Sequence, residues 1–459
     1  MPDLMQPLAK HVFFPLFALK QGSSVPRHLR EFERSQYFSP DRIAAMQLER
    51  LRALLGHAYR NCPFYTRRFD EAGLVPSRVQ SIDDLRVLPV LTKKDIQTNL
   101  ARLTAQNLPP SDLVPDKTGG STGQPLNFFI NQDRVYSRNA AALRHDRWTG
   151  WDIGCKTAYL WGHHGDLGTV ARLKNRIKDT LLDRNLILDT ASITAPKLEQ
   201  FRKGLLKFRP VIYVGYANSV YLYARFLRDT GVRDYHRPSA IITSAELLDP
   251  EQRQVIEKVF GCKVFDRYGS RETSIIASEC DRHTGLHVCA ETILLEIVAD
   301  NQPAQPGQLG KIIITDLMNY GMPFIRYRIE DIGRPSPHKS CSCGRGLPLI
   351  DMAAGRVTDF LVTPDGKIIS GASLTIFLIA NTPGLAQAQF VQERKDELIM
   401  RIVKGEKFND ESLRYLNEQI PEFFGPKVKY HFEYVDSIPP EPSGKHRFSL
   451  SKLDISEMF

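Results

Sequence analysis

Several features that would place this chain of 459 residues in a specialised class are missing from it. Cysteine is scarce, and no export signal is recognisable. Seven cysteines are an odd number, which favours a reducing cytoplasm over a disulfide framework. The sequence also contains no internal repeat and no low-complexity tract. The cysteines are therefore first considered as metal ligands or catalytic groups.

Long hydrophobic runs are also missing. The start, Met1–Met5, lacks the basic residues and the apolar run of a signal peptide. The most apolar segment, Val12–Leu19, is too short to span a bilayer and contains a proline. We interpret it as a docking segment and expect no stable membrane insertion; reversible membrane contact is the second option. The expected location is the cytoplasm.

Acidic residues are fewer than basic ones, 52 against 61, so the net charge is +9. Such a charge suits nucleic acid, an anionic membrane surface or phosphorylated ligands. No zinc-finger, helix-turn-helix or RNP pattern accompanies it, so we expect no nucleic-acid partner. We expect most of the basic residues on solvated helix faces and a subset of them at nucleotide-binding sites.

What is present is an ordinary globular composition, with 42% apolar and 25% charged residues. The length predicts at least two domains. Residues Asp41–Arg60 have helical apolar spacing. Strand-like Val211–Val214 and Ala240–Thr243 each precede a helical pattern, and this alternation predicts an α/β sheet. Ile293–Val298 and Lys311–Thr315 then predict adjacent strands of a β-rich subdomain.

A break predicted near Asp351–Gly355 is followed by about 100 residues with a pattern of their own. They include a hairpin around Pro364–Lys367 and a helix over Glu411–Gln419. We therefore predict a large N-terminal domain over residues 1–354 and a small α+β C-terminal domain over residues 355–459.

The stretch Thr118–Pro125 reads Thr-Gly-Gly-Ser-Thr-Gly-Gln-Pro. Dense glycines and hydroxyls leave backbone N–H groups free to surround a polyphosphate, which indicates a nucleoside triphosphate. No Lys-Ser or Lys-Thr follows at Walker A spacing. The candidate phosphate ligands are the hydroxyls of Thr118, Ser121 and Thr122 and the amides of Gly119, Gly120 and Gly123. An ordinary flexible loop is the alternative.

Four further segments follow in a fixed order: Asp266–Glu272, Met322–Ile332, Gly355–Asp359 and Pro442–Arg447. Together with the glycine loop they resemble the adenylate-forming enzyme superfamily. The chain is most similar to the phenylacetate-CoA ligase branch, including relatives from capsular polysaccharide gene clusters, because Asn61–Tyr65 and Leu88–Lys93 also match that branch. The resemblance covers about positions 55 to 450.

The resemblance implies an ATP-dependent ligase that converts a carboxylic acid to an acyl-adenylate, releases pyrophosphate and passes the acyl group to coenzyme A. One alternative is transfer to an amine or hydroxyl acceptor without coenzyme A, as in capsule biosynthesis. A second alternative is a non-catalytic nucleotide-binding protein. Departures from the family pattern keep that alternative open; they are Gln124, Arg271, Glu330 and Thr358.

The resemblance also assigns nucleotide contacts. Ser244, Ala245 and Glu246 would line the adenine pocket, and Tyr268 with Gly269 would lie beside the adenine. A carboxylate at Asp331 would accept hydrogen bonds from the ribose hydroxyls. Glu272 would bind Mg²⁺, a hard cation that prefers oxygen ligands.

Two basic residues complete the implied catalytic set with Glu272. Arg356 would reach the nucleotide at the domain junction, about which the C-terminal domain of relatives rotates. Lys445, in a Pro-Ser-Gly-Lys stretch, would supply a mobile cation for the carboxylate and the α-phosphate.

Cysteine and histidine residues between positions 280 and 343 offer soft metal ligands. A Cys3His set suits four-coordinate structural Zn²⁺. Similarity to zinc-containing relatives favours Cys280, His287, Cys341 and Cys343 as ligands, with His283 and Cys289 in reserve. Unligated loop cysteines are the alternative.

The segment Trp161–Gly165 has the character of a loop that lines an acyl pocket. In it, Trp161, His163 and His164 would contact the acid, and the two histidines would orient the carboxylate or act as acid and base; structural hydrogen bonding is the alternative. The sequence does not identify the acid, and a homodimer stays open.

Overall fold

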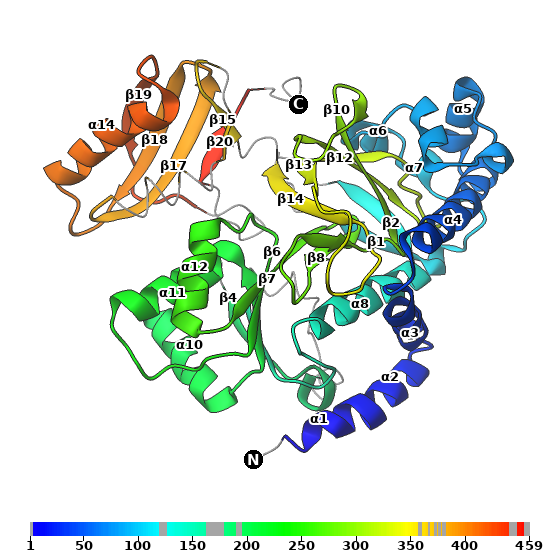
Figure 1. Ribbon diagram of the computed structural model, residues 1–459, viewed down its shortest axis with the longest axis horizontal. Helices are drawn as coiled ribbons and strands as arrows, with labels where there is room; N and C mark the ends of the chain where they lie inside the picture. The colour runs from blue at the N-terminus through cyan, green and yellow to red at the C-terminus, as the bar shows by residue number, and fades with distance from the viewer. Residues whose placement is uncertain are drawn as a thin grey trace.

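The computed structural model describes residues 3–118, 126–161, 179–189, 195–356, 360–365, 368–370, 374, 378, 382–439 and 448–453. The chain forms an α/β body around one large sheet and a smaller α+β unit at its C-terminal end (Figure 1). The predicted fold class is confirmed. In the described part of the chain, no helix is both long enough and apolar enough to cross a membrane.

The first hundred residues are helical. Helix α4 contains the helix predicted over 41–60, and the side-chain oxygen of Ser39 accepts a hydrogen bond from the Arg42 amide at its start. Its apolar side packs, with that of α5, into the largest hydrophobic core. The helices of this region are α1 (Met5–Leu8), η1 (Ala9–Phe13, a π-helical turn), α2 (Phe14–Lys20), α3 (Val25–Ser35), α4 (Pro40–Asn61), α5 (Pro63–Ala72), α6 (Lys93–Thr98) and α7 (Leu100–Leu103).

One half of the large sheet is parallel and has the strand order β7-β6-β5-β3-β4. Alternate residues of these strands enter two different apolar clusters, so both faces are buried. Helices α10, α11 and α12 cover one face (Figure 1). The elements are β3 (Thr157–Trp161), β4 (Asn185–Asp189), α10 (Ala195–Phe208), β5 (Ile212–Tyr216), α11 (Ala217–Asp229), β6 (Ala240–Ser244), α12 (Pro250–Phe260) and β7 (Lys263–Ser270).

The other half of the sheet contains the predicted strands of the β-rich part. It has its own core, but it continues the same twelve-stranded sheet rather than forming a separate one. The strand β9 joins β14 through only two residue pairs, Leu349–His287 and Ile350–Leu286. Its strands are β8 (Ser274–Glu279), β9 (Leu286–Val288), β10 (Ile293–Ala299), β11 (Gln302–Pro303), β12 (Gly310–Asp316), β13 (Tyr327–Pro335) and β14 (Leu349–Arg356).

The segment Asp351–Gly355, near which we predict the boundary between the two domains, is a strand. Strand β14 runs through this segment and pairs with β13 as far as Arg356 opposite Asp331. Small residues at 353–355 gave no apolar alternation that would reveal a strand. The pairing with β13 imposes one.

The C-terminal unit has a separate four-stranded sheet with the order β19-β18-β17-β20. Helix α14 includes the predicted helix and packs its apolar side into a separate core. The predicted hairpin is present as an antiparallel pair. The elements are β15 (Phe360–Val362), β16 (Ile368–Ser370), β17 (Leu385–Arg394), β18 (Glu397–Lys404), α14 (Asp410–Phe424), β19 (Lys429–Tyr434) and β20 (Ser449–Ser451).

Helix α8 (Gln132–Arg147) follows the two strands on either side of the Thr118–Pro125 segment, and buried ion pairs attach it to the large sheet. The Arg134 guanidinium lies 2.8 Å from the Asp316 carboxylate at the end of β12, and both side chains are at most 1% exposed. Arg134 also donates to the carbonyl of Thr273 at 2.9 Å. Further along the helix, Arg144 forms a fully buried pair with Glu291. Charge pairing, rather than apolar contact alone, therefore fixes the position of α8.

Replacing Asp316 by alanine would leave the Arg134 cation buried without its carboxylate. We expect Asp316→Ala to reduce the free energy of unfolding by about 3–5 kcal/mol, because an unpaired buried charge is strongly destabilising. Chemical denaturation measures this loss. Asp229→Ala, which removes surface pairs with Arg225 and Arg228, is the matched control and should change stability by less than about 1 kcal/mol. Equal effects of the two variants would contradict this role for Asp316.

Candidate nucleotide and metal sites

The glycine loop joins two antiparallel strands, β1 (Leu113–Lys117) and β2 (Asn127–Asn131). Thr118 closes the neck of the loop: its amide donates to the Leu126 carbonyl at 3.0 Å, and its hydroxyl accepts from the Leu126 amide at 2.9 Å. The predicted phosphate ligands beyond the neck lie outside the described residues; they are Gly119, Gly120, Ser121, Thr122 and Gly123.

Asp116, two residues before Thr118, lies between two arginines. Arg271 Nε is 3.1 Å from its carboxylate, and an Arg138 amino group is 3.4 Å from it. Arg271 follows the motif strand β7, and Arg138 comes from α8. The contacts therefore tie the neck of the glycine loop to the segment that contains Tyr268 and Glu272.

Tyr268 and Asp331 are brought together from different motifs. The Tyr268 hydroxyl donates to Asp331 Oδ2 at 2.8 Å, although 63 positions separate the residues. Burial, reinforced by the Asp331 charge, raises the pKa of Tyr268 well above its ordinary value, so the phenol stays a donor. The parallel pairing of β6 with β7 ends at Ser244 and Arg267, one residue before Tyr268. Strand β7 continues to Ser270 because it also pairs with antiparallel β8.

Glu272 is 9% exposed and lies after β7. Its Oε1 accepts a hydrogen bond from the Tyr327 hydroxyl at 3.1 Å. Its main-chain carbonyl accepts from Arg138. These contacts fix the backbone and one carboxylate oxygen, and they place the predicted Mg²⁺ ligand beside the Asp331 strand β13.

Ser244, Ala245 and Glu246 form the turn that leaves β6. Ala245 has a left-handed φ of +67°, which makes this a sharp turn. Glu246 Oε2 accepts from the Asn218 amide at 2.9 Å, in the first turn of α11. Open α/β sheets bind ligands outside the carboxyl ends of their strands, where this turn lies.

Of the remaining predicted residues, the structure describes Trp161 and the backbone of Arg356. The Arg356 backbone pairs with Asp331 across β13 and β14. Trp161 ends β3 and its ring centroid lies 4.5 Å from that of Tyr216. His163, His164 and Lys445 lie outside the described residues.

Three residues of this site were not selected from the sequence. Tyr327 stands within the Met322–Ile332 motif, in which Asp331 was assigned to the ribose, so the motif itself carried the signal. Asp116 gave a weaker signal by its position just before the loop. Arg138 gave none, because burial of an arginine depends on the acidic partners that α8 meets in the fold.

The four predicted zinc ligands lie together. One ligand atom from each of Cys280, His287, Cys341 and Cys343 falls within 4.8 Å of all the others. The Cys280 and Cys341 sulfurs are 3.7 Å apart, and His287 Nε2 is 3.4 Å from the Cys343 sulfur. A disulfide needs a separation of about 2 Å. Two thiolates at about 2.3 Å from one tetrahedral ion would be ~3.8 Å apart, so the spacing fits a zinc centre.

Strand β9 explains why these residues meet. Cys280 directly follows β8, His287 lies on β9, and the other two cysteines lie in the β13–β14 connection; β9 pairs with both β8 and β14. Backbone amides donate to two of the sulfurs at 3.5 Å, from Arg282 to Cys280 and from Arg345 to Cys343. Such donors stabilise thiolate charge.

The protonation of the cluster also suits a metal. Burial lowers the pKa of His287 to about 4, which keeps its imidazole neutral at neutral pH. Burial raises the pKa of Cys341, but hydrogen bonds, first that from Thr284 at 3.0 Å, bring it below its usual value. Burial raises the pKa of Cys280 to about 12, so this thiol needs a cation to ionise at neutral pH.

The two reserve ligands belong elsewhere. His283 Nδ1 lies 3.3 Å from the Glu279 carboxylate. Cys289 accepts a hydrogen bond from Arg144 at 3.3 Å, within the buried Arg144–Glu291 pair. The cluster therefore consists of the four residues selected first.

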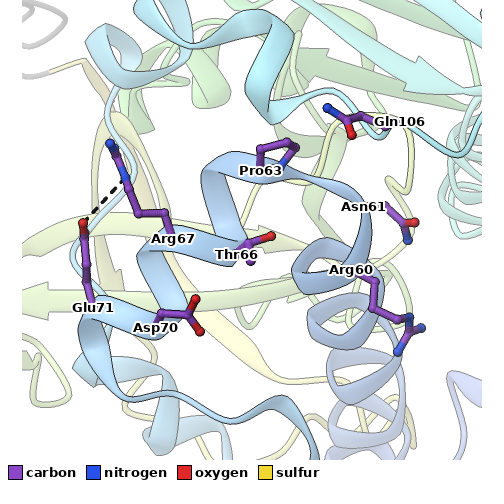
Figure 2. A pocket seen from close by; sticks show the side chains of 8 residues that line it. All are labelled: Arg60, Asn61, Pro63, Thr66, Arg67, Asp70, Glu71 and Gln106. Carbon is purple, nitrogen blue, oxygen red and sulfur yellow. Dashed lines mark ion pairs between the residues drawn. The ribbon is translucent and has the colours of Figure 1, made fainter.

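A surface hollow on another part of the molecule does not coincide with either site. Figure 2 shows it at the junction of α4 and α5, with Arg60, Arg67, Asp70 and Glu71 among the side chains that line it. Arg67 and Glu71 form an ion pair at 3.6 Å. The mixed charge of this wall gives no preference for an anion.

Asp266, on β7 just before Tyr268, is a buried acid with an unusual pKa. Burial, with the Glu279 charge, raises its pKa from 3.8 to about 7. Its Oδ1 accepts from the Thr243 hydroxyl at 3.1 Å and from the Arg267 amide at 3.0 Å. An asparagine in this place could keep both hydrogen bonds without any charge.

Because the pKa of Asp266 is raised in the folded state, the folded protein binds the extra proton between about pH 4 and pH 7. Stability from this group should therefore fall as pH rises through that range. As pH rises, we expect the free energy of unfolding of Asp266→Asn to fall by about 1–3 kcal/mol less than that of wild type. Denaturation of both proteins between about pH 5 and pH 8 measures it, and parallel stability curves would contradict the raised pKa.

Comparison with known proteins agrees with the motif order. Residues 361–452 match the family model CapK C-terminal domain. The chain is 25% identical over 415 residues to Protein CapK of Staphylococcus aureus, with 89% of each chain covered. It is 27% identical over 342 residues to phenylacetate-coenzyme A ligase of Escherichia coli K12, covering 71% of this chain and 73% of the relative.

A solved structure extends the comparison to the fold. The crystal structure of 2-hydroxyisobutyryl-CoA ligase, in its postadenylation state with R3-HIB-AMP, matches with a TM-score of 0.73. The identity is 19%, and 93% of each chain is covered. This chain therefore has the fold of the adenylate-forming ligases and is a relative of Protein CapK and of the phenylacetate-coenzyme A ligases.

Proposed function

We propose that the protein is an ATP-dependent ligase that activates a carboxylic acid as an acyl-adenylate, releases pyrophosphate and transfers the acyl group to coenzyme A. The observation that carries this proposal is the hydrogen bond between Tyr268 and Asp331, which unites an adenine-contact motif with a ribose-contact motif. The phenylacetate-coenzyme A ligase of E. coli and 2-hydroxyisobutyryl-CoA ligase have names that describe this reaction type.

A chain of contacts supports the arrangement of the nucleotide. Asp116 links the neck of the glycine loop to Arg271, and Glu272 contacts Tyr327 on the strand of Asp331. In this arrangement the phosphates would lie at the loop, the adenine beside Tyr268, Gly269 and Ser244–Glu246, and the ribose at Asp331. Tyr268 holds one oxygen of Asp331 and so orients the carboxylate towards the ribose hydroxyls.

Mg²⁺ and two cations complete the proposed chemistry. Glu272 would hold Mg²⁺ against the phosphates. Arg356 would contact the nucleotide from β14, and Lys445 would stabilise the charge that develops on the α-phosphate. The acid would lie near Trp161, His163 and His164. A separate C-terminal domain over residues 355–459 would bring Lys445 to the site and withdraw it before thioester formation.

We also infer that Cys280, His287, Cys341 and Cys343 hold a structural Zn²⁺. Three sulfurs and one neutral imidazole supply the four ligands of a closed tetrahedral site. Such a site leaves no open position for substrate, so its role is to fix the β13–β14 connection to β8 and β9. Reduced cysteines in this number fit a cytoplasmic protein.

A second function remains specific enough to test. In this function the acyl group passes from the adenylate to an amine or hydroxyl, without coenzyme A. The match of residues 361–452 to the CapK C-terminal domain favours it, because we propose that this part of the chain determines which acceptor is used. The adenylation half-reaction is common to both functions.

We expect carboxylate-dependent exchange of labelled pyrophosphate into ATP for one class of acid in a panel of aryl, fatty, amino and sugar acids. Lys445→Ala should lower the exchange rate by roughly 100-fold or more, because a preorganised cation that acts only in the transition state contributes several kcal/mol. Lys452→Ala is the matched control; this neighbouring lysine pairs with Glu393 and should leave the rate unchanged.

The acceptor is decided with the same acid. Release of AMP that depends on coenzyme A supports the ligase proposed first, whereas release by amines without coenzyme A replaces it with the second function. ATP binding with no exchange for any acid, and no difference between wild type and Lys445→Ala, would overturn both in favour of a non-catalytic nucleotide-binding protein.

Purified protein should contain about one zinc ion per chain by elemental analysis, and Cys343→Ser should lose most of it, since a structural site needs all four ligands. The melting temperature of the variant should fall with the zinc content. Cys262→Ser, at a free cysteine outside the cluster, is the control. The metal site would be contradicted if purified wild type contained no zinc and added zinc did not stabilise it.

A further inference from the structure

The N-terminal helices α1, η1 and α2 are apolar around most of their circumference, apart from Gln6, Lys10, His11 and Lys20. Their inner side buries Ala9 and Ala18 and packs Phe14 and Phe17 against α3 and α8. Their outer side exposes an aliphatic stripe; its members and exposed fractions are Leu4 77%, Leu8 45%, Val12 41%, Leu16 57% and Leu19 81%. A helix that is apolar all round is normally covered on every side. The outer stripe therefore calls for an occupant.

The stripe is straight because of the local helix geometry. In an α-helix, residues four apart drift by about 40° around the axis, since there are 3.6 residues per turn. The π-helical turn Ala9–Phe13 is wider, so it cancels part of this drift between Leu8 and Val12. Exposed Pro7 and Pro15 lie beside the stripe and extend its apolar surface.

The segment cannot turn its outer side inward. Gly154 leaves room for Ala9, since a Cβ on this glycine would lie 2.4 Å from the Ala9 Cβ. Gln6 donates to the Ile153 carbonyl at 3.1 Å, and Lys10 pairs with Asp152 at 2.7 Å. These three contacts fix the inner side, so the stripe is held outward; helices α1 and α2 lie along the lower edge of the molecule in Figure 1.

The charges around the stripe indicate the nature of the occupant. No acidic residue occurs between Leu4 and Gln21, while Lys20 is exposed at the end of α2. Helix α3 then exposes Arg30 and Arg34, and the whole chain has a net charge of +9. An apolar stripe that is followed along the chain by exposed basic residues suits a helix that lies in the interface of an anionic membrane.

The dimensions favour a membrane over a second copy of the chain. A stable protein interface needs a broad patch of about 800 Å² on each partner, whereas this stripe is narrow even with the two prolines beside it. At sixteen residues the segment reaches about 24 Å as a helix, too short to span a bilayer core of about 30 Å. It is therefore suited to lie in the plane of the membrane.

We propose that the outer stripe of residues 4–19 binds the surface of an anionic phospholipid membrane and holds the protein there peripherally. Leucine and valine side chains enter the boundary between head groups and acyl chains, and Lys20 with the arginines of α3 contacts the lipid phosphates. Docking through this edge leaves the C-terminal unit, drawn at the other end of the molecule in Figure 1, away from the membrane.

The test is co-sedimentation of the full-length protein with phosphatidylcholine vesicles, prepared with and without phosphatidylglycerol. We expect wild type to sediment with the anionic vesicles, less so as salt is raised. The double variant Leu8→Gln/Leu16→Gln should partition roughly tenfold more weakly, because it removes the apolar contact. The control is Val75→Gln/Leu222→Gln. It changes two exposed apolar residues, one in the loop after α5 and one on α11, and should bind like wild type.

Three results would overturn the proposal. Wild type could stay in the supernatant with both kinds of vesicle, both double variants could bind equally, or sedimentation could be the same without phosphatidylglycerol. Light scattering examines the other occupant directly: a wild-type dimer that becomes monomeric in Leu8→Gln/Leu16→Gln would assign the stripe to self-association. Circular dichroism of each variant checks that it is folded.

Discussion

The buried pair of Arg134 and Asp316 is the interaction on which the candidate nucleotide site depends. It fixes α8 against the end of β12, and the other contact of Arg134, to the Thr273 carbonyl, reaches the turn after Glu272. One helical turn later, Arg138 contacts both the Glu272 carbonyl and Asp116. Residues four apart lie on the same side of a helix, so fixing Arg134 also fixes Arg138. The neck of the glycine loop and the proposed Mg²⁺ ligand are thus positioned by one helix.

The second constraint is the short contact between strands β9 and β14 within the β-rich half of the sheet. The two strands meet through two residue pairs, although side chains of both belong to the same apolar core. His287 belongs to one of those pairs and also to the Cys3His cluster. A metal at the cluster would join Cys280 after β8 to the connection between β13 and β14, and so support the contact between β9 and β14. Asp331 and Arg356 lie further along the same two strands.

The sequence predicted the parts of this arrangement that local pattern and motif identity determine. Helix α4 and the alternation around β5 and β6 followed from spacing and residue type, whereas the choice of four residues for the Cys3His cluster followed from the resemblance to zinc-containing relatives. Strand β14 did not, because Met352–Gly355 acquires strand structure only by pairing with β13. Arg138 and Asp116 were missed for a related reason. A buried arginine looks like a solvated one in sequence, and only the fold reveals that Asp116, Glu272 and α8 meet.

The same reasoning changes how the departure at Arg271 is understood. Arg271 departs from the motif that the chain resembles, and taken alone this departure favours loss of function. In the structure, Arg271 pairs with Asp116 at the neck of the loop, while Glu272 next to it keeps its contact with Tyr327. An added cation is accommodated by an acid already bound to Arg138, and it leaves the carboxylates of Glu272 and Asp331 in place. Arg271 is thus a local ion-pair partner that ties the loop to strand β7, and it gives no support to a non-catalytic protein.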